Sequence, residues 1–419
     1  MSDLINRINS YEKDFWDFKQ YYGNGIEKIC RYPAVMVSPM QYQLLSDIVD
    51  TQSEIKTVLD PFHGSATVLY EAKKLGLKTY GIDINPLANL IAHVKVDGVN
   101  KKYALKVIDS IELSLLGDSF NYDVHDFINI DKWFRKDIKE SLSKLRHLIL
   151  RVDDLHTRRY LWVCFADIVR RFSNTRSSTF KLHVKEPETI NKMKNDVEKQ
   201  FIKKIKSNLA YLHDFNNKNR TSLYLGDSKE VLKDKFKDSS INLICTSPPY
   251  GDNQTTVTYG QFSMLQLYWI DTMDCDDFPL DLISNYSSLD RESLGGRRKE
   301  GSYFNCKALS DSLKQISVDK HKKIISFIDD YYWVFKEMHR ILSKNGLLVI
   351  TVGNRTVDRV KIPFDTINID IAKSFGMNLE TTIERNIHNK SIPKNVSRVK
   401  KLGSVKSMTK EKTLIFRKG

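Results

Sequence analysis

The sequence has no long apolar run. No stretch approaches the roughly 20 apolar residues that a membrane-spanning helix needs. The N-terminus carries acidic and aromatic residues early and lacks the apolar core of a secretory signal. We therefore expect a cytoplasmic protein without a membrane partner.

Cysteine is scarce. The five cysteines are widely spaced and none forms a CxxC pair, so neither a disulfide framework nor a zinc site is indicated and no metal is expected. Charge, by contrast, is unbalanced: 66 basic and 52 acidic residues give a formal net charge of +14. This surplus is compatible with a polyanionic partner such as nucleic acid, although it does not identify one.

Glycine is nearly absent between residues 100 and 215, where the apolar spacing is helical, as in 138–150 and 160–172. We interpret residues 101–215 as a helical insertion. The remaining segments are 1–100 with the cofactor motifs, 216–270 with a catalytic loop, a polar basic segment at 271–320, and a C-terminal part at 321–419.

An α/β pattern surrounds the insertion. Strand 56–60, helix 68–75 and strand 78–83 follow one another, and Asn85-Pro86 opens the next helix. Further strands are predicted at 222–227, 241–246, 347–352, 378–385 and 412–417. Helices are predicted at 324–342, with a stop at Asn345-Gly346, and at 365–375. The alternation predicts a Rossmann-like fold with a mostly parallel, doubly wound sheet.

The turn from Asp60 to Thr67 is rich in small residues and joins a strand to a helix. Such a turn lets the backbone approach a ligand closely and directs helix N–H groups at it. Asp83, about 20 residues further on, ends the next strand, where an acid can bind both hydroxyls of a ribose. Its alternative role is to cap the helix that begins near Asn85.

The loop Ser247-Pro248-Pro249-Tyr250 follows a buried strand. Prolines donate no N–H, so a hydroxyl and carbonyl oxygens can face a pocket purely as acceptors. An exocyclic base amine needs such acceptors, because its lone pair is delocalised into the base ring. Hydrogen bonds accepted from both of its hydrogens free that lone pair. Tyr250 offers a flat face for an extruded base, as in base flipping. Alternatively, the loop is a proline turn with a packed tyrosine.

Both segments resemble motifs of the amino-type DNA methyltransferases. The turn after Asp60 resembles the cofactor motif of that family, and Thr246 to Tyr250 is similar to the catalytic motif of its N4-cytosine branch. The resemblance covers nearly the whole chain and implies S-adenosylmethionine as cofactor and double-stranded DNA as partner. One position departs from the family pattern, because Ala66 stands where glycine is usual.

The resemblance also implies individual roles. The segment Arg31 to Ala34 is similar to the one that holds the methionine end of the cofactor, and Asp83 matches the acid on the ribose. Asp227 matches the acid that reads the adenine amine. The implied catalytic residues are Ser247, Pro248, Pro249 and Tyr250. The implied cofactor-binding residues are Tyr32, Pro33, Asp60, Pro61, Phe62, Gly64, Ser65, Thr67, Asp83, Ile84, Asp227 and Thr246.

The DNA-contacting residues are predicted separately, from side chains suited to phosphates and base edges. The candidates are Arg170, Arg171, Asn174, Arg176 and Lys181 in the insertion, and Arg297 and Arg298 in the polar segment. Alternatively, the candidates in the insertion lie at a solvated helix end, and those in the polar segment lie in an ordinary surface loop. The cofactor motif precedes the catalytic motif, which leaves the target-recognition region unplaced.

Cys245 precedes the loop, but its position inside a strand argues against a cysteine nucleophile. Tyr259, Phe262 and Trp269 follow the loop and either line the target pocket or pack.

The predicted function is site-specific transfer of a methyl group from S-adenosylmethionine to the N4 amine of cytosine. The implied context is restriction–modification or a related defence system, with a cognate restriction endonuclease as a further partner. Adenine N6 is the main alternative, because the chemistry is shared; adenine enzymes usually carry Asp or Asn where this chain has Ser247. An RNA amine methyltransferase and an inactive DNA-binding protein of the same fold are further alternatives.

Overall fold

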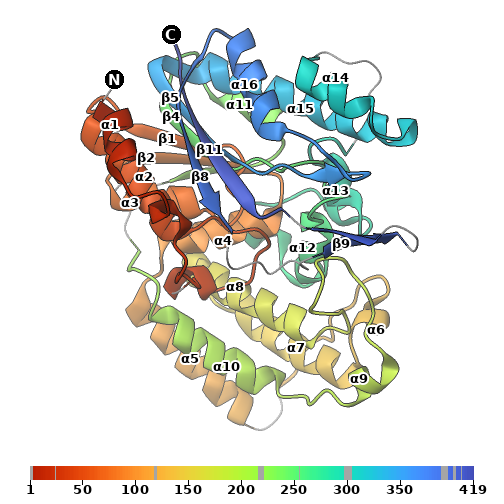
Figure 1. Cartoon of the computed structure of the whole chain (residues 1–419). Helices are drawn as coiled ribbons and strands as arrows, with labels where there is room; N and C mark the ends of the chain where they lie inside the picture. The colour runs from red at the N-terminus through yellow and green to blue at the C-terminus, as the bar shows by residue number, and fades with distance from the viewer. Residues whose placement is uncertain are drawn as a thin grey trace.

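A central sheet with helices on both faces organises the chain (Figure 1). The computed structural model describes residues 3–23, 25–117, 120–215, 221–253, 255–296, 304–387, 395–399, 403–406 and 408–419. Within these ranges no helix is long and apolar enough to cross a membrane.

Seven strands form the sheet, in the order β3-β2-β1-β4-β5-β11-β8. Their bounds are β1 Thr57–Asp60, β2 Lys78–Asp83, β3 Ser222–Leu225, β4 Ile241–Thr246, β5 Leu342–Val352, β8 Asn378–Asn386 and β11 Lys410–Arg417. The pairs from β3 to β5 are parallel, whereas β11 runs antiparallel to both β5 and β8. The sheet is therefore mostly parallel, and the fold is α/β and Rossmann-like as predicted. Two small hairpins pair β6 (Thr356–Val357) with β7 (Val360–Lys361) and β9 (Asn395–Val399) with β10 (Gly403–Lys406).

Helices cover the sheet and extend below it in Figure 1. Those before the insertion are α1 Asp3–Ser10, η1 Phe15–Asp17, η2 Gly25–Lys28, α2 Ser38–Thr51, α3 Thr67–Lys74 and α4 Pro86–Asp97. Those within it are α5 Lys101–Leu116, α6 Ile130–Trp133, α7 Lys136–Leu150, α8 Leu155–Phe172, α9 Pro187–Asn191 and α10 Val197–Leu209. Those after it are α11 Ser228–Lys235, α12 Tyr259–Trp269, η3 Thr272–Cys275, η4 Leu280–Ile283, α13 Ser288–Glu292, α14 Lys307–Leu313, α15 Val318–Ile341 and α16 Phe364–Ser374.

Alternating side chains of the strands explain the two helical layers. In β1, Val58 packs against α2 and α3, whereas its neighbour Leu59 packs against the layer of α11, α15 and α16. Successive strand side chains point to opposite faces, so an apolar run is buried on both sides. Because β1, β2 and β4 run parallel, their carboxyl ends lie at the same edge of the sheet, where the site forms.

The helices of the insertion do not form a separate core. Side chains of α5, α7, α8 and α10 join those of α4 and α12 in one buried cluster, which includes Tyr160, Trp162 and Trp269. Val99, which leads into α5, pairs with Asp214 on the returning chain, so the two ends of the insertion lie side by side.

The predicted stop at Asn345-Gly346 is wrong. α15 ends at Ile341, and both residues lie in β5. Asn345 adopts the left-handed conformation with φ 62°. The register confirms an irregularity, because Ile241 pairs with Leu342 but Leu243 pairs with Leu347. The Asn-Gly pair therefore forms a bulge in the strand, whereas sequence alone cannot separate a bulge from a helix stop.

Candidate cofactor pocket and catalytic loop

The turn between β1 and α3 is held by the acid at the end of β2. Gly64 adopts φ +49° and its N–H donates to Asp83 Oδ2 at 2.9 Å. Asn85 N donates to the other oxygen, Asp83 Oδ1, at 2.8 Å. Asp83 thus joins the cofactor turn to the start of α4, while the side chain of Asn85 caps that helix through Leu87 N.

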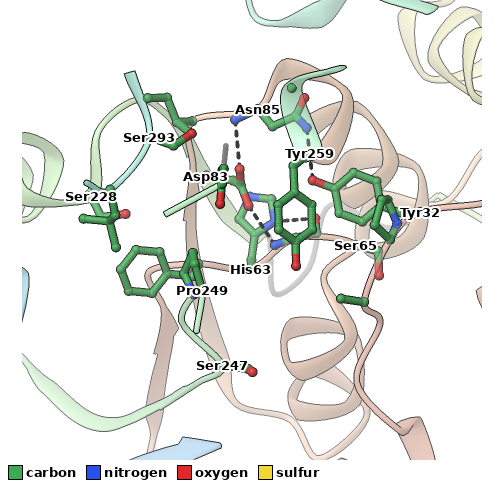
Figure 2. A pocket seen from close by; sticks show the side chains of 18 of the residues that line it. Tyr32, His63, Ser65, Asp83, Asn85, Ser228, Ser247, Pro249, Tyr259 and Ser293 are labelled. Atoms are coloured by element: carbon green, nitrogen blue, oxygen red, sulfur yellow. Dashed lines mark hydrogen bonds between the residues drawn. The ribbon is translucent and has the colours of Figure 1, made fainter. Parts of the chain in front are cut away.

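A pocket opens above this turn. Figure 2 shows Asp83 between the rings of Tyr32 and Tyr259 on one side and Ser228 and Pro249 on the other. Asn85 Nδ2 donates to Tyr32 Oη at 3.1 Å and to Ser263 Oγ at 2.8 Å, which ties three segments together. The lining comprises Tyr32, Pro33, Ala34, Val35, Met36, Phe62, His63, Gly64, Ser65, Thr67, Asp83, Ile84, Asn85, Asp227, Ser228, Ser247, Pro249, Asn253, Tyr259, Gly260, Leu289, Glu292, Ser293 and Leu294.

The structure brings most of the predicted cofactor residues to this lining, with three differences. Asp60, Pro61 and Thr246 are not among the lining residues. Thr246 Oγ1 donates to Asp60 Oδ1 at 2.6 Å, and burial raises the pKa of Asp60 to about 6. The Pro61 carbonyl accepts from Ser228 Oγ at 2.5 Å. These residues hold the ends of β1 and β4 together behind the pocket wall.

A buried lysine supports the turn from below. Lys95 of α4 is 2% exposed, and its Nζ donates to the carbonyl oxygen of Ser65 at 2.8 Å. Burial lowers the pKa of Lys95 to about 8. Sequence reasoning missed this residue, because α4 also carries Asn89, His93 and Asp97 and nothing in the sequence marks the lysine as inward-facing.

α13 borders the same pocket, although its segment was predicted as a DNA-contacting loop. Leu289, Glu292, Ser293 and Leu294 line the pocket. Asp290 accepts from the N–H groups of Gly260 and Gln261 at 2.8 and 3.0 Å, which caps α12. Burial raises the pKa of Asp290 to about 6. Arg297 and Arg298 lie outside the described residues.

The loop after β4 separates the pocket from a larger groove. Ser247 and Pro249 line both spaces, whereas Pro248 and Tyr250 line only the groove. Tyr250 Oη lies 3.2 Å from Ser247 Oγ and 3.4 Å from Glu411 Oε1. The loop therefore presents its polar atoms where the pocket meets the groove. Hydrogen bonds hold the hydroxyl of Tyr250, and its ring lines the groove.

Charged residues from both halves of the chain line the groove. The cations are Lys28, Arg31, Lys320, Lys323, Arg355, Arg359 and Arg385. Acids offset part of this charge, since Lys320 pairs with Asp358 and Arg385 pairs with Glu411. Sequence reasoning missed Arg355 and Arg385, which lie near the catalytic loop only after folding.

Of the predicted DNA-contacting residues that the structure describes, some are exposed and others are buried. Arg171, Arg176 and Lys181 are exposed. Arg170 and Asn174 are buried, at 8% and 5% exposure. The guanidinium of Arg170 lies 4.8 Å from the ring centroid of Phe262 on α12 and donates to Thr179 O, so it packs between the insertion and α12 instead of facing solvent.

The remaining candidates are structural. Cys245 is 1% exposed within β4, as predicted, and burial raises the pKa of its thiol well above the usual range. Phe262 and Trp269 are buried in the core, whereas Tyr259 lines the pocket.

Comparison with known proteins identifies the class of this arrangement. The profile of a family described as DNA methylase, of the N6/N4 type, matches residues 241–419. The chain is 30% identical over 445 aligned residues to the type II methyltransferase M.MvaI of Kocuria varians, covering 98% of this chain and 96% of that protein. A shorter match, 32% over 100 residues, is to the type II methyltransferase M.MjaII of Methanocaldococcus jannaschii, covering 21% of this chain and 18% of that one.

Two solved structures show weaker similarity. A putative DNA modification methylase from Thermus thermophilus, complexed with S-adenosyl-L-methionine, is 19% identical, with 46% of this chain and 53% of that one covered and a TM-score of 0.24. The rRNA methyltransferase aviRa from Streptomyces viridochromogenes is 10% identical, with coverage of 94% and 90% and a TM-score of 0.26. Similarities at these TM-scores carry no conclusion about function.

The chain belongs to the DNA methylases that modify exocyclic amines. It is a DNA methyltransferase, and its methyl donor is S-adenosylmethionine.

The pocket fits this cofactor on its own chemistry. Thr67 Oγ1 and Asn253 Oδ1 are buried, line the pocket and have no hydrogen-bond partner among the described residues. Buried polar atoms of this kind are normally satisfied by a ligand or by water. Carboxylates at Asp83 and Asp227 can accept from hydroxyl or amine groups, and Phe62, Ile84 and Leu289 offer apolar surface for a planar base.

Proposed function

We propose that this enzyme methylates the N4 amine of cytosine at a specific DNA sequence. The observation that carries the proposal is the hydroxyl of Ser247, which stands where the cofactor pocket meets the groove. A hydroxyl and a backbone carbonyl together supply two acceptors for the two hydrogens of an amine. Neither Pro248 nor Pro249 can add a competing N–H donor.

The chain's own residues would then act by orientation. Ser247 Oγ and the Pro248 carbonyl accept the hydrogens of the amine, which frees its lone pair toward the pocket. Tyr250 supplies the face on which an extruded base stacks, since a base inside a duplex is out of reach. The bound cofactor supplies an electrophilic methyl group, and Asp83 and Asp227 hold its nucleoside end. Direct transfer needs no nucleophilic cysteine, in keeping with the buried Cys245.

The groove is the proposed path of the DNA. Lys28 and Arg31 are exposed and Lys323 is half-buried there, and none of the three pairs with a carboxylate among the described residues. The exposed Arg171, Arg176 and Lys181 extend the proposed contact surface, and Arg176 would have to leave its ion pair with Glu186. Phosphate neutralisation of this kind positions DNA without reading its sequence.

The name of the K. varians relative adds a context. That protein is named a type II methyltransferase, and for this chain we propose a restriction–modification setting, with a cognate endonuclease as partner. Co-purification of a nuclease encoded beside this protein would test the setting.

Nucleoside mass spectrometry identifies which base is methylated. The protein is expressed in a host without its own DNA methylation, and the DNA is digested to nucleosides. We expect 4-methylcytosine, and a Ser247→Ala variant should lose it. Appearance of 6-methyladenine without 4-methylcytosine would establish the adenine alternative and overturn the cytosine proposal.

A further inference from the structure

A chain of polar side chains leads from the catalytic loop to the last strand of the sheet. Ser247 Oγ lies 3.2 Å from Tyr250 Oη, which donates to Glu411 Oε1 at 3.4 Å. The second oxygen of Glu411 accepts from Arg385 Nε at 3.0 Å. Glu411 belongs to β11 and Arg385 to β8, so the anchor of this chain lies on strands remote in sequence from the loop.

The chemistry of the end group sets the direction of these bonds. Glu411 forms an ion pair with Arg385, and a carboxylate in an ion pair only accepts hydrogen bonds. The hydroxyl of Tyr250 therefore donates its hydrogen bond to Glu411, which leaves the tyrosine oxygen free to accept one. Ser247 then donates to Tyr250, and the lone pairs of Ser247 Oγ are directed away from the tyrosine.

We propose that Glu411 is a positioning residue, which acts through Tyr250 to orient the hydroxyl of Ser247 as an acceptor for the target amine. This inference rests on the proposed role of Ser247. Without Glu411 the serine hydroxyl can reverse, pointing its hydrogen at the amine and opposing the bond that the reaction needs. The same contact holds the ring of Tyr250 in one plane.

The surroundings make this orientation effective. The Glu411 side chain is 19% exposed and that of Arg385 is 9% exposed, so water competes weakly for their hydrogen bonds. The charged or titratable groups that act on the Tyr250 hydroxyl are Glu411, Arg385 and Tyr259. Gly353, which follows β5, makes room for the ring, because a Cβ there would lie 2.9 Å from Tyr250 Cε2.

A purely structural role is the alternative. In that case the Glu411–Arg385 pair only joins β11 to β8, and its loss would lower stability without changing the methyl-transfer step. The two roles differ in whether the effect passes through the hydroxyl of Tyr250, which a double-mutant cycle measures.

The test uses the full-length enzyme, Tyr250→Phe, Glu411→Gln and the double variant. Methyl transfer is followed with enzyme in excess, using labelled S-adenosylmethionine and genomic DNA from a host without methylation. Phe keeps the stacking face and removes only the hydroxyl. Glu384→Gln is the matched control, because Glu384 lies on the neighbouring strand, pairs with Lys410 and does not line the groove.

Each single variant should lower the transfer rate by about tenfold, as loss of one hydrogen bond does, while the affinities for cofactor and DNA persist. The double variant should be no slower than either single one, and the control should match the wild type. Multiplied effects in the double variant would overturn the proposal, and so would an unchanged rate in Tyr250→Phe. That second result decides the matter even if Glu411→Gln fails to fold. Because the label reports either base, this outcome is independent of whether cytosine or adenine is modified.

Discussion

At the scale of single residues, Asp83 lines the pocket and also holds the surrounding backbone in place, because it accepts from the N–H groups of Gly64 and Asn85. Ala66 illustrates the cost of such a turn. Its φ of +61° is the left-handed conformation in which glycine is favoured, and its side chain is fully buried among Leu69, Ala92 and Val96.

Asp83→Ala should weaken cofactor binding by about tenfold or more, because a charged group loses its hydrogen bonds to the ligand. Tyr250→Ala should leave cofactor affinity unchanged and lower the methyl-transfer rate. Calorimetry with S-adenosylmethionine and a transfer assay measure the two effects. Asp83→Asn, which keeps one acceptor oxygen, should fall between wild type and alanine. Equal loss of cofactor affinity at both positions would contradict these roles.

Lys95 gives the stability of the protein a defined pH dependence. Its folded pKa of about 8 lies below the ordinary 10.5, so between these values the unfolded chain binds more protons than the folded one. This group therefore adds stability as pH rises from 8 to 10.5, by up to about 3 kcal/mol.

Urea unfolding of the wild type and Lys95→Met at a series of pH values isolates the effect, because subtracting the two curves cancels the other groups. The difference should shift in favour of the wild type as pH rises. A difference independent of pH would show that folding does not lower the pKa of Lys95.

At the scale of elements, two backbone segments approach closely where the insertion leaves α4 and returns to the sheet. Gly98 directly follows α4 with φ +73°, and a Cβ there would lie 2.4 Å from the carbonyl oxygen of His213. Val99 N donates to that same oxygen at 3.2 Å. The close approach of two backbones fixes how the helices of the insertion sit on α4.

Gly98→Ala should lower the free energy of unfolding by about 2 kcal/mol or more, because backbone strain adds to overlap with another main chain. Gly76 is the matched control, since it follows α3 with φ +76° and nothing lies within 4 Å of an added Cβ. Gly76→Ala should cost about 1 kcal/mol from strain alone. Thermal or urea unfolding measures the loss of stability in the two variants. Equal losses would mean that the backbone at His213 moves aside without a measurable energetic cost.

At the scale of the whole molecule, the loop Ser247–Tyr250 lies between the smaller pocket and the larger groove. The pocket is built from the ends of parallel strands, where α/β sheets commonly bind ligands. Residues of the N-terminal segment, the start of α15 and the β6–β7 hairpin line the groove. In the proposed function, the cofactor reaches Ser247 from the pocket and the DNA reaches it from the groove.

DNA affinity should fall steeply as salt rises, because basic residues of the groove release counterions from the phosphates. Lys323→Ala should reduce the slope of log affinity against log salt by about 1. Lys373→Ala is the control, because Lys373 is exposed on α16 and does not line the groove. A salt-independent affinity, or the same slope change in both variants, would count against the groove as the DNA path.

The sequence by itself determined the elements whose signals are local. The turn after Asp60 and the Ser-Pro-Pro-Tyr loop each follow a short buried strand, and their chemistry depends on neighbours within a few residues. For that reason the α/β class and the strands around the site could be predicted, and nine of the twelve residues predicted to bind the cofactor line the pocket. The same local signals misassigned Asn345-Gly346, since an Asn-Gly pair suits a bulge as well as a helix end.

Only the tertiary structure decided which residues distant in sequence contact the Ser247–Tyr250 loop. Tyr250 and Glu411 are 161 positions apart, and no pattern in the sequence connects them. Burial likewise turned Arg170 inward and placed Lys95 under Ser65. Such contacts depend on strand order and helix packing, which bring distant side chains together and remove water from around them. Local sequence therefore determines the reactive loop, and the folded sheet supplies the carboxylate that we propose orients it.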